Sequence, residues 1–227
     1  MYKKGDFHIH TTFSDGSFTP KEIIKKAKIK GLDIIAITDH NSVDGVHEAI
    51  EEGNKEGIKV IPGVEISSRV NNIRVHVLGY FKEGDYDERL IIALNYIRTH
   101  NNNKFDKFIK DNFNISFRRD HICVEKAITL IKYFNGVAIL AHPVLISRKY
   151  FSNIINLGFH GLEAKYCKNT QEDTEFFINF AKTHGMIYTA GSDYHRTTEL
   201  YRAHGNLGDV YLNGEEIKIF LNFLYKK

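Results

Sequence analysis

Short apolar runs alternate with amphipathic segments along most of this 227-residue chain. Runs of this length, bounded by turn-forming residues, are typical of buried β-strands. We expect strands at residues 34–38, 60–64, 75–80, 136–141, 161–166 and 187–192.

Segments with helical periodicity lie between the apolar runs. The first has recognisable ends, because Thr19 suits an N-cap, Pro20 suits the first helical position and Gly31 can end the helix. The alternation predicts an α/β fold with a mainly parallel sheet, either doubly wound or closed as a barrel. We expect further helices over residues 44–57, 87–111, 124–134, 171–184 and 215–224.

Polar residues able to bind metals lie at or just beyond the carboxyl ends of the predicted strands. In a barrel these ends meet at one mouth, whereas a doubly wound sheet brings them together less completely. A barrel is therefore favoured, with fewer or less regular units than eight. The residues are His10, Asp39 with His40, Glu65, His142, and Asp193 with His195.

The composition is that of one domain. With 42% hydrophobic residues, a chain of this length can bury one substantial core. No apolar stretch approaches the roughly 20 residues of a membrane span. His8 and His10 come too early for a removable signal peptide, so we expect a cytoplasmic location. Cys123 and Cys167 form no CxxC pair and are expected to be free thiols, and the net charge of +3 mildly favours an anionic ligand.

The first candidate ligands are His8 and His10, which are two residues apart on a predicted strand. Side chains with this spacing face the same side, so the pair can bind one ion together. Asp15 follows in a turn-prone FSDG sequence. Each residue also has an ordinary structural explanation, because strand histidines often form hydrogen bonds and aspartates often stabilise turns.

A second group follows the strand predicted over 34–38. Asp39 and His40 should face opposite ways, so we expect His40 to bind metal and Asp39 to orient a ligand. A helix-capping Asp beside a surface His is the alternative. Glu65 ends another apolar run, where a buried carboxylate is costly unless it is paired or bound to metal. We expect Glu65 to bridge two ions.

Nitrogen and oxygen ligands without thiolates suit Mn, Zn or Fe. Nine ligands are too many for one such ion, so two or three divalent metals are predicted. The nine are His8, His10, Asp15, His40, Glu65, His76, His142, Asp193 and His195. The remaining histidines match no ligand position and are expected to be structural or on the surface: His47, His100, His121, His160, His184 and His204.

Six motifs in the chain resemble those of the PHP (polymerase and histidinol phosphatase) superfamily: HIHTTFSDGS, ITDHNSVDG, PGVEIS, HVLGY, AHP and GSDYH. The resemblance covers residues 7–207, and all nine ligand positions hold the expected residue type. It implies a single domain over 1–227 that forms a distorted (β/α)7 TIM-like barrel with a trinuclear metal site at its mouth. Within the superfamily the chain is most similar to small phosphatases that act on 5′-nucleotides, 3′,5′-bisphosphonucleotides or short RNA.

The chain departs from those phosphatases where they bind substrate. Their helical lid corresponds to a shorter insert here, at about 82–120. Asn169 also stands where a phosphate-contacting histidine is expected. Arg118 and Arg119 are candidates for a phosphate clamp, because guanidinium groups match phosphate oxygens, although they also suit a solvated loop. Lys165 and Asn169 are further candidates for substrate binding.

The expected activity is metal-dependent hydrolysis of phosphomonoesters, of nucleotides or short oligonucleotides, by a metal-bound hydroxide near Glu65. Three alternatives stay open. One is a small-metabolite phosphatase of the histidinol-phosphate type, another is a non-catalytic metal-binding PHP module, and the third is hydrolysis of a C–N bond. The complete ligand set argues against the module. We expect a phosphorylated substrate as the binding partner and no membrane.

Overall fold

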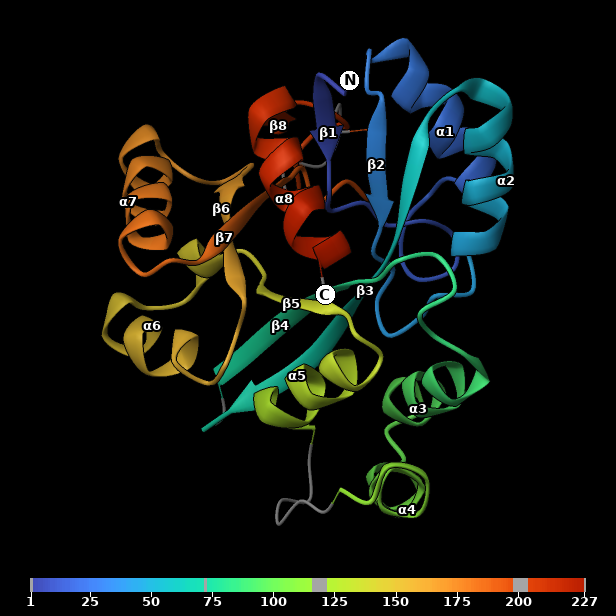
Figure 1. The fold of residues 1–227 in the computed structure, drawn as a ribbon, viewed down its shortest axis with the longest axis vertical. Coiled ribbons are helices and arrows are strands. Elements are labelled where there is room, and N and C mark those ends of the chain that lie inside the picture. The colour runs from blue at the N-terminus through green and yellow to red at the C-terminus, as the bar shows by residue number, and fades with distance from the viewer. Residues whose placement is uncertain (1, 72, 116–121, 198–203, 227) are drawn as a thin grey trace.

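The computed structural model describes residues 2–71, 73–115, 122–197 and 204–226. Its strands form one eight-stranded sheet in the order β7-β6-β5-β4-β3-β2-β1-β8 (Figure 1). The strands are β1 (Lys4–Asp6), β2 (Ile34–Ile37), β3 (Lys59–Val70), β4 (Ile73–Tyr80), β5 (Val137–Leu140), β6 (Gly161–Tyr166), β7 (Ile187–Gly191) and β8 (Leu212–Asn213).

The sheet curves until its first and seventh strands meet beyond β1. The Phe7 amide donates a hydrogen bond to the Ala190 carbonyl over 3.0 Å, and Ile9 forms a parallel bridge with Tyr194. The short strand β8 pairs with the start of β1. The result is a nearly closed barrel, which confirms the predicted distorted TIM-like fold.

Eight α-helices and one 3-10 helix lie in the described ranges, and two apolar layers form the core. Residues on one face of the strands pack against the surrounding helices, whereas those on the other face fill the barrel. The helices are α1 (Pro20–Ile29), α2 (Val46–Glu56), α3 (Glu88–Arg98), α4 (Asn102–Phe113), α5 (Val124–Tyr133), η1 (Pro143–Leu145), α6 (Arg148–Ile155), α7 (Gln171–Thr183) and α8 (Gly214–Lys226). None of them has both the length and the apolar character needed to span a bilayer.

Helix α8 closes one end of the barrel (Figure 1). Its apolar residues Ile217, Phe220 and Leu224 are buried with the inward-facing strand residues. The Phe220 ring packs edge-on against Phe7, with 4.8 Å between centroids. With this end filled by apolar side chains, the buried cluster of acidic residues and histidines lies toward the opposite mouth.

Helix α1 begins and ends as its sequence predicts. Thr19 is the N-cap and forms a capping box with Glu22, while Pro20 occupies the first turn. After the helix, Gly31 takes a left-handed backbone conformation with φ 69°, which glycine adopts at little cost. Local sequence signals were therefore sufficient to predict both ends of α1.

The sheet is mainly parallel, as predicted, within β1–β3 and β5–β7, but β4 and the short β8 are antiparallel to their neighbours. Strand β4 runs antiparallel to both of its neighbours. Val70 pairs with Ile73, which leaves only two residues between β3 and β4. A parallel crossover needs a dozen residues or more, so this connection allows only a hairpin.

Three further expectations need correction. The single helix predicted over 87–111 is broken into α3 and α4, because His100 takes a positive φ of 54° and the Asn101 side chain caps the start of α4. Helix α6 and strand β8 were not predicted. His8 and His10 follow β1 rather than lying within it.

Candidate metal centre

The extended segment after β1 carries the first two predicted ligands. Ile9 bridges to Tyr194, so the backbone keeps its strand-like course and the rings of His8 and His10 point to the same side. Their Nε2 atoms lie 3.1 Å apart, and both side chains are buried. The two side chains therefore face the same side, as predicted, although β1 ends before them.

Glu65 lies at the centre of the cluster and is only 1% exposed. One carboxylate oxygen, Oε2, faces nitrogens of three histidines, and the other, Oε1, faces nitrogens of two more. Both oxygens of this carboxylate therefore face ring nitrogens, as the predicted bridging role requires. The distances are 3.3 Å to His8, 3.3 Å to His10, 3.1 Å to His40, 3.0 Å to His76 and 3.0 Å to His142.

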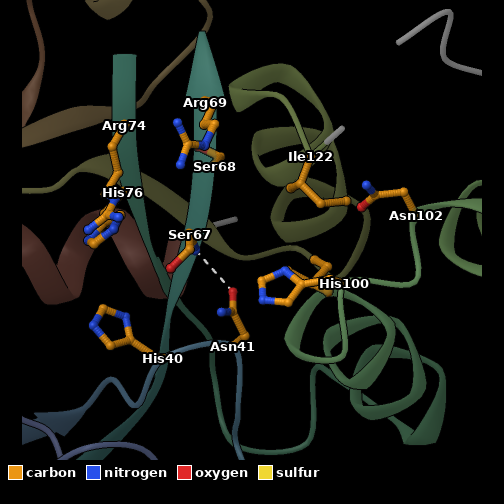
Figure 2. Close-up of a pocket in the computed structure, with 11 residues that line it drawn as sticks. His40, Asn41, Ser67, Ser68, Arg69, Arg74, His76, His100, Asn102 and Ile122 are labelled. Carbon is orange, nitrogen blue, oxygen red and sulfur yellow. Dashed lines mark hydrogen bonds between the residues drawn. The ribbon is translucent and has the colours of Figure 1, made fainter. Parts of the chain in front are cut away.

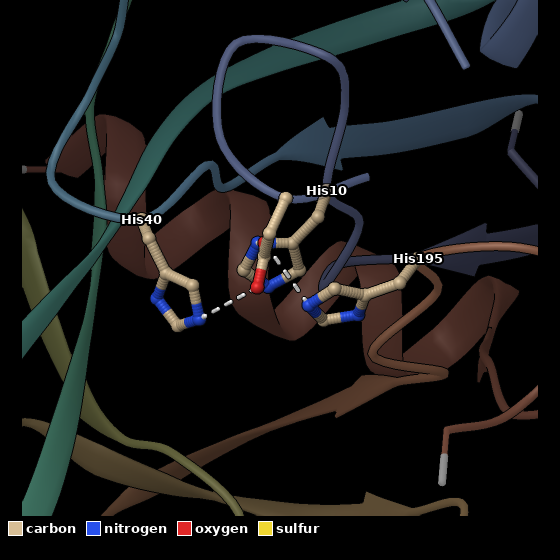
Figure 3. A group of neighbouring side chains, drawn as sticks. His10, His40 and His195 are labelled. Atoms are coloured by element: carbon tan, nitrogen blue, oxygen red, sulfur yellow. Dashed lines mark ion pairs between the residues drawn. The ribbon is translucent and has the colours of Figure 1, made fainter. Parts of the chain in front are cut away.

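The donors fall into overlapping groups, each with ligand atoms within 4.8 Å of one another. Three of the groups together contain eight of the nine predicted ligands, and His142 joins them through Glu65. Figure 3 shows the rings of His10, His40 and His195 gathered around the Asp15 carboxylate, which forms ion pairs with His40 and His195. The three groups are His10 with Asp15, His40 and His195; His8 with His10, Glu65 and Asp193; and His40 with Glu65 and His76.

His40 provides a direct test of whether metals fit this cluster. Its Nδ1 atom is buried and forms no hydrogen bond within the described ranges, although Glu65 Oε2 is only 3.1 Å away. A buried nitrogen without a hydrogen bond is costly unless another partner satisfies it. Because its neighbours are imidazole and carboxylate groups, a divalent cation is the fitting partner. The arrangement is that of a multinuclear metal site.

Close packing of acids and histidines shifts their pKa values when no metal is bound. Burial would raise the pKa of Glu65 and Asp193, but the neighbouring histidines hold both well below the usual range. Burial would lower the pKa of His10, but hydrogen bonds to Asp193 and Glu65 raise it to about 9. Burial lowers the pKa of His40 to about 4. The carboxylates are therefore ionised and ready to bind cations.

Glu163, on β6, supports the ligands and was missed from the sequence. It is fully buried, its Oε1 lies 2.9 Å from His8 Nδ1, and its Oε2 accepts a hydrogen bond from the His142 amide over 2.8 Å. This carboxylate fixes the orientation of the His8 ring and the position of His142. A charged residue within an apolar strand was the available signal, as it was for Glu65.

Asp39 acts on the loop after β1 rather than on the adjacent His40 ring. Its carboxylate accepts hydrogen bonds from the Thr11 amide and hydroxyl, both over 2.7 Å, and from the Ser14 hydroxyl over 2.5 Å. Ser14 Oγ in turn lies 3.4 Å from His10 Nδ1. Asp39 thus orients His10 through Ser14 and holds the loop that leads to Asp15.

His204, which was expected to be structural or on the surface, lies beside the cluster. Its Nδ1 lies 3.0 Å from Asp193 Oδ2, and its ring stacks on His195 with 4.0 Å between centroids. The Tyr166 hydroxyl donates to the same Asp193 oxygen over 2.9 Å. No motif identifies His204, because only the folded loops bring it beside Asp193.

A cavity of about 270 Å3 opens over these ligands, and we call it the metal cavity. Two basic residues that were not predicted, Arg74 and Lys168, line it together with Glu65, His76 and His142. Positive side chains at the rim of such a cavity favour an anionic substrate.

The residues predicted to bind substrate lie elsewhere or outside the described ranges. Lys165 forms an ion pair with Glu216 of α8 over 2.6 Å, and Asn169 donates a hydrogen bond to the Ala164 carbonyl over 2.8 Å. Both line a different cavity, in which none of the nine ligands takes part. Arg118 and Arg119 fall outside the described residues. A role in substrate binding stays a prediction for all four.

Comparison with known proteins adds independent information. The family model described as PHP domain matches residues 6–204. A 5′-3′ exoribonuclease of Haemophilus influenzae is 24% identical, with 86% of this chain and 91% of that protein covered. A 3′,5′-nucleoside bisphosphate phosphatase of Chromobacterium violaceum is also 24% identical, over 90% and 92%. A crystal structure from Bifidobacterium adolescentis, described as a metal-dependent phosphoesterase, superposes with a TM-score of 0.77 at 20% identity and covers 96% of both chains.

Proposed function

Because the chain belongs to the PHP domain family of metal-dependent phosphoesterases, we propose that it hydrolyses phosphomonoesters of nucleotides or short oligonucleotides. The observation that carries this proposal is the position of Glu65, whose two oxygens face five histidine nitrogens at the mouth of the barrel. The named activities of the two relatives support nucleotides or RNA as the substrate class.

Two or three divalent ions, of Mn, Zn or Fe, would fit this donor set. When bound, such ions lower the pKa of water from about 15.7 toward 7 and offset the negative charge of a phosphate ester. The residues that would hold them are the nine predicted ligands, with Glu65 between neighbouring ions. His204, beside Asp193, is a tenth candidate.

The protein groups around the ions have separate tasks. Glu163 keeps the His8 ring oriented, and Asp39 acts through Ser14 on His10, so the ligands need little rearrangement to bind. Arg74 and Lys168 at the cavity rim favour a phosphorylated substrate through their positive charge. The apolar layer around α8 closes the other end of the barrel, so substrate and water enter through the mouth.

The helices α3 and α4 occupy most of the insert over about 82–120. We propose that this insert is a shortened lid within a single-domain protein. A shorter lid leaves more of the mouth accessible, which suits an oligonucleotide end as well as a mononucleotide.

The test is phosphate release by manganese-loaded protein from AMP, 3′,5′-bisphosphoadenosine, a short 5′-phosphorylated RNA and histidinol phosphate. We expect release from at least one nucleotide substrate, in preference to histidinol phosphate, and loss of that release in His8→Ala. Metal content is measured in both proteins. Preference for histidinol phosphate would overturn the nucleotide assignment, and inactivity in protein that carries metal would overturn the phosphatase assignment.

A further inference from the structure

One face of the β3–β4 hairpin runs outward from the metal ligands to a pair of arginines. The register places Ser67 opposite His76 and Arg69 opposite Arg74, with Glu65 two residues before Ser67. Residues two apart on a strand share a face and are separated by about 6.6 to 6.8 Å. The two arginines therefore lie one such step beyond Ser67 and His76, on the face that also carries Glu65.

Arg69 and Arg74 are both exposed and lie directly across from each other. Within residues 2–71, 73–115, 122–197 and 204–226, neither guanidinium has a carboxylate at ion-pair distance. Like charges directly opposite each other destabilise a strand pair. An anion between the two side chains would remove this repulsion.

The two arginines line a cavity of about 480 Å3, which we call the arginine cavity (Figure 2). It adjoins the metal cavity, because His40, Arg74 and His76 line both. The space therefore continues from the metal ligands to the arginine pair. A substrate that occupies both cavities would have one end at the metals and another at the guanidinium groups.

Other groups in the arginine cavity are also arranged to bind a polar ligand. Asn41 Oδ1 accepts a hydrogen bond from the Ser67 amide over 3.0 Å, which fixes the Asn41 side chain and directs its amide group (Figure 2). The Arg69 backbone is held by a 3.0 Å hydrogen bond from its amide to the Ile122 carbonyl. The base of the arginine pair is thus fixed, and only the side chains need to adjust.

We propose that the arginine cavity binds a second phosphate group of the substrate, one that is not hydrolysed. This inference rests on the proposed phosphatase function. Guanidinium groups offer forked donors that match phosphate oxygens, and two of them suit a doubly charged or bridging phosphate. The single step of about 6.6 to 6.8 Å from the predicted ligand His76 to Arg74 is comparable with the separation of successive phosphates in a nucleic acid. A bisphosphorylated nucleotide and a 5′-phosphorylated oligonucleotide share this chemistry.

The test compares substrates with one and two phosphates. In wild-type protein, kcat/KM should be higher for 3′,5′-bisphosphoadenosine than for AMP. In the double variant Arg69→Gln/Arg74→Gln, the ratio of these two values should fall by about tenfold to a hundredfold, as expected for lost charge-assisted hydrogen bonds. Lys218→Gln, an exposed position on α8 at the opposite end of the barrel, is the matched control for loss of positive charge and should keep the wild-type ratio.

A binding measurement separates recognition from turnover. Metal-free protein is titrated with 3′,5′-bisphosphoadenosine at several salt concentrations by calorimetry. The double variant should bind more weakly, and the negative slope of log K against log salt should become shallower by about 0.7 for a lost phosphate contact. A 5′-phosphorylated dinucleotide titrated in parallel distinguishes the two sources of the second phosphate, because the compound whose phosphates reach both cavities should bind more tightly.

Two outcomes would overturn the inference. One is equal wild-type activity on AMP and on both substrates with a second phosphate. The other is an equal loss for AMP and 3′,5′-bisphosphoadenosine in the double variant, because the arginines would then act on the hydrolysed phosphate. Wild-type protein inactive on every phosphate ester would instead contradict the proposed function itself. Should the double variant fold poorly, Arg74→Glu keeps the test possible, because it places opposite charges across the hairpin.

Discussion

The metal cavity and the arginine cavity share His40, Arg74 and His76, but the groups that distinguish them are of opposite kinds. The first has buried carboxylates and imidazoles, and these contact one another at 3.0 to 3.4 Å. The second has exposed guanidinium groups on a hairpin, with no ion pair to either within the described ranges. The difference indicates a division of tasks, because the dense cluster suits cations whereas the arginines suit a substrate anion.

The largest effect is expected at the centre of the metal cavity. Glu65→Gln removes the charge that five histidines surround, so phosphate release should fall by about a thousandfold or more for every substrate. Initial rates are measured together with metal content. Glu52→Gln, at a mostly buried glutamate of α2, should retain activity. Full activity of Glu65→Gln with unchanged metal content would show that this carboxylate does not have the central role proposed for it.

A smaller effect is expected for Glu163, which contacts two of the predicted metal ligands. Glu163→Gln weakens the support of His8 and His142, and loss of such support typically costs about tenfold to a hundredfold in metal affinity. Metal titration followed by calorimetry measures this change, and circular dichroism checks the fold. If the affinity stays at the wild-type value, Glu163 is merely a buried structural residue.

The two cavities should also differ in their response to pH. In metal-free protein, Asp193 and Glu65 raise the pKa of His10 from 6.5 to about 9, so metal binding near neutral pH must release a proton, and affinity should fall with acidification. The same shift stabilises the metal-free fold below about 6.5 and this stabilisation is lost as the pH rises through about 9. Arginines stay charged throughout this range.

Proton release on metal addition to weakly buffered protein tests the first part of this prediction, and thermal unfolding of metal-free protein across the pH range tests the second. Metal loading with no proton release near neutral pH would mean that His10 is already neutral. An unchanged thermal midpoint between these pH values would contradict the predicted loss of stability.

The smallest effect concerns the stability of the hairpin. Arg74→Glu turns a like-charge pair into an opposite-charge pair, so the free energy of unfolding should rise by about 0.2 to 1 kcal/mol. Chemical denaturation measures it. Lys218→Glu, which makes the same charge change on α8, should stay within about 0.5 kcal/mol of wild type. A destabilised Arg74→Glu protein would show that the two guanidinium groups do not repel each other as inferred.

The barrel and the ligand residues were predicted from local features of the sequence. Apolar runs marked the strands, and residue type with position at a strand end marked Glu65 and His142 as ligands. The hairpin direction was also readable, because two residues between β3 and β4 permit no crossover helix, but the alternation rule was applied too widely. Glu163 could have been found in the same way as Glu65, as a charge within an apolar strand.

The sequence by itself determined the positions of β2 to β7, the cap of α1 and the types of residue predicted to bind metal, because each depends on neighbours along the chain. Only the tertiary structure decided that His204 joins Asp193 and that Arg69 faces Arg74. These contacts depend on how loops fold over the barrel mouth and on the pairing of β3 with β4. A shift of one residue in that pairing would move the arginines to opposite faces, since side chains alternate along a strand.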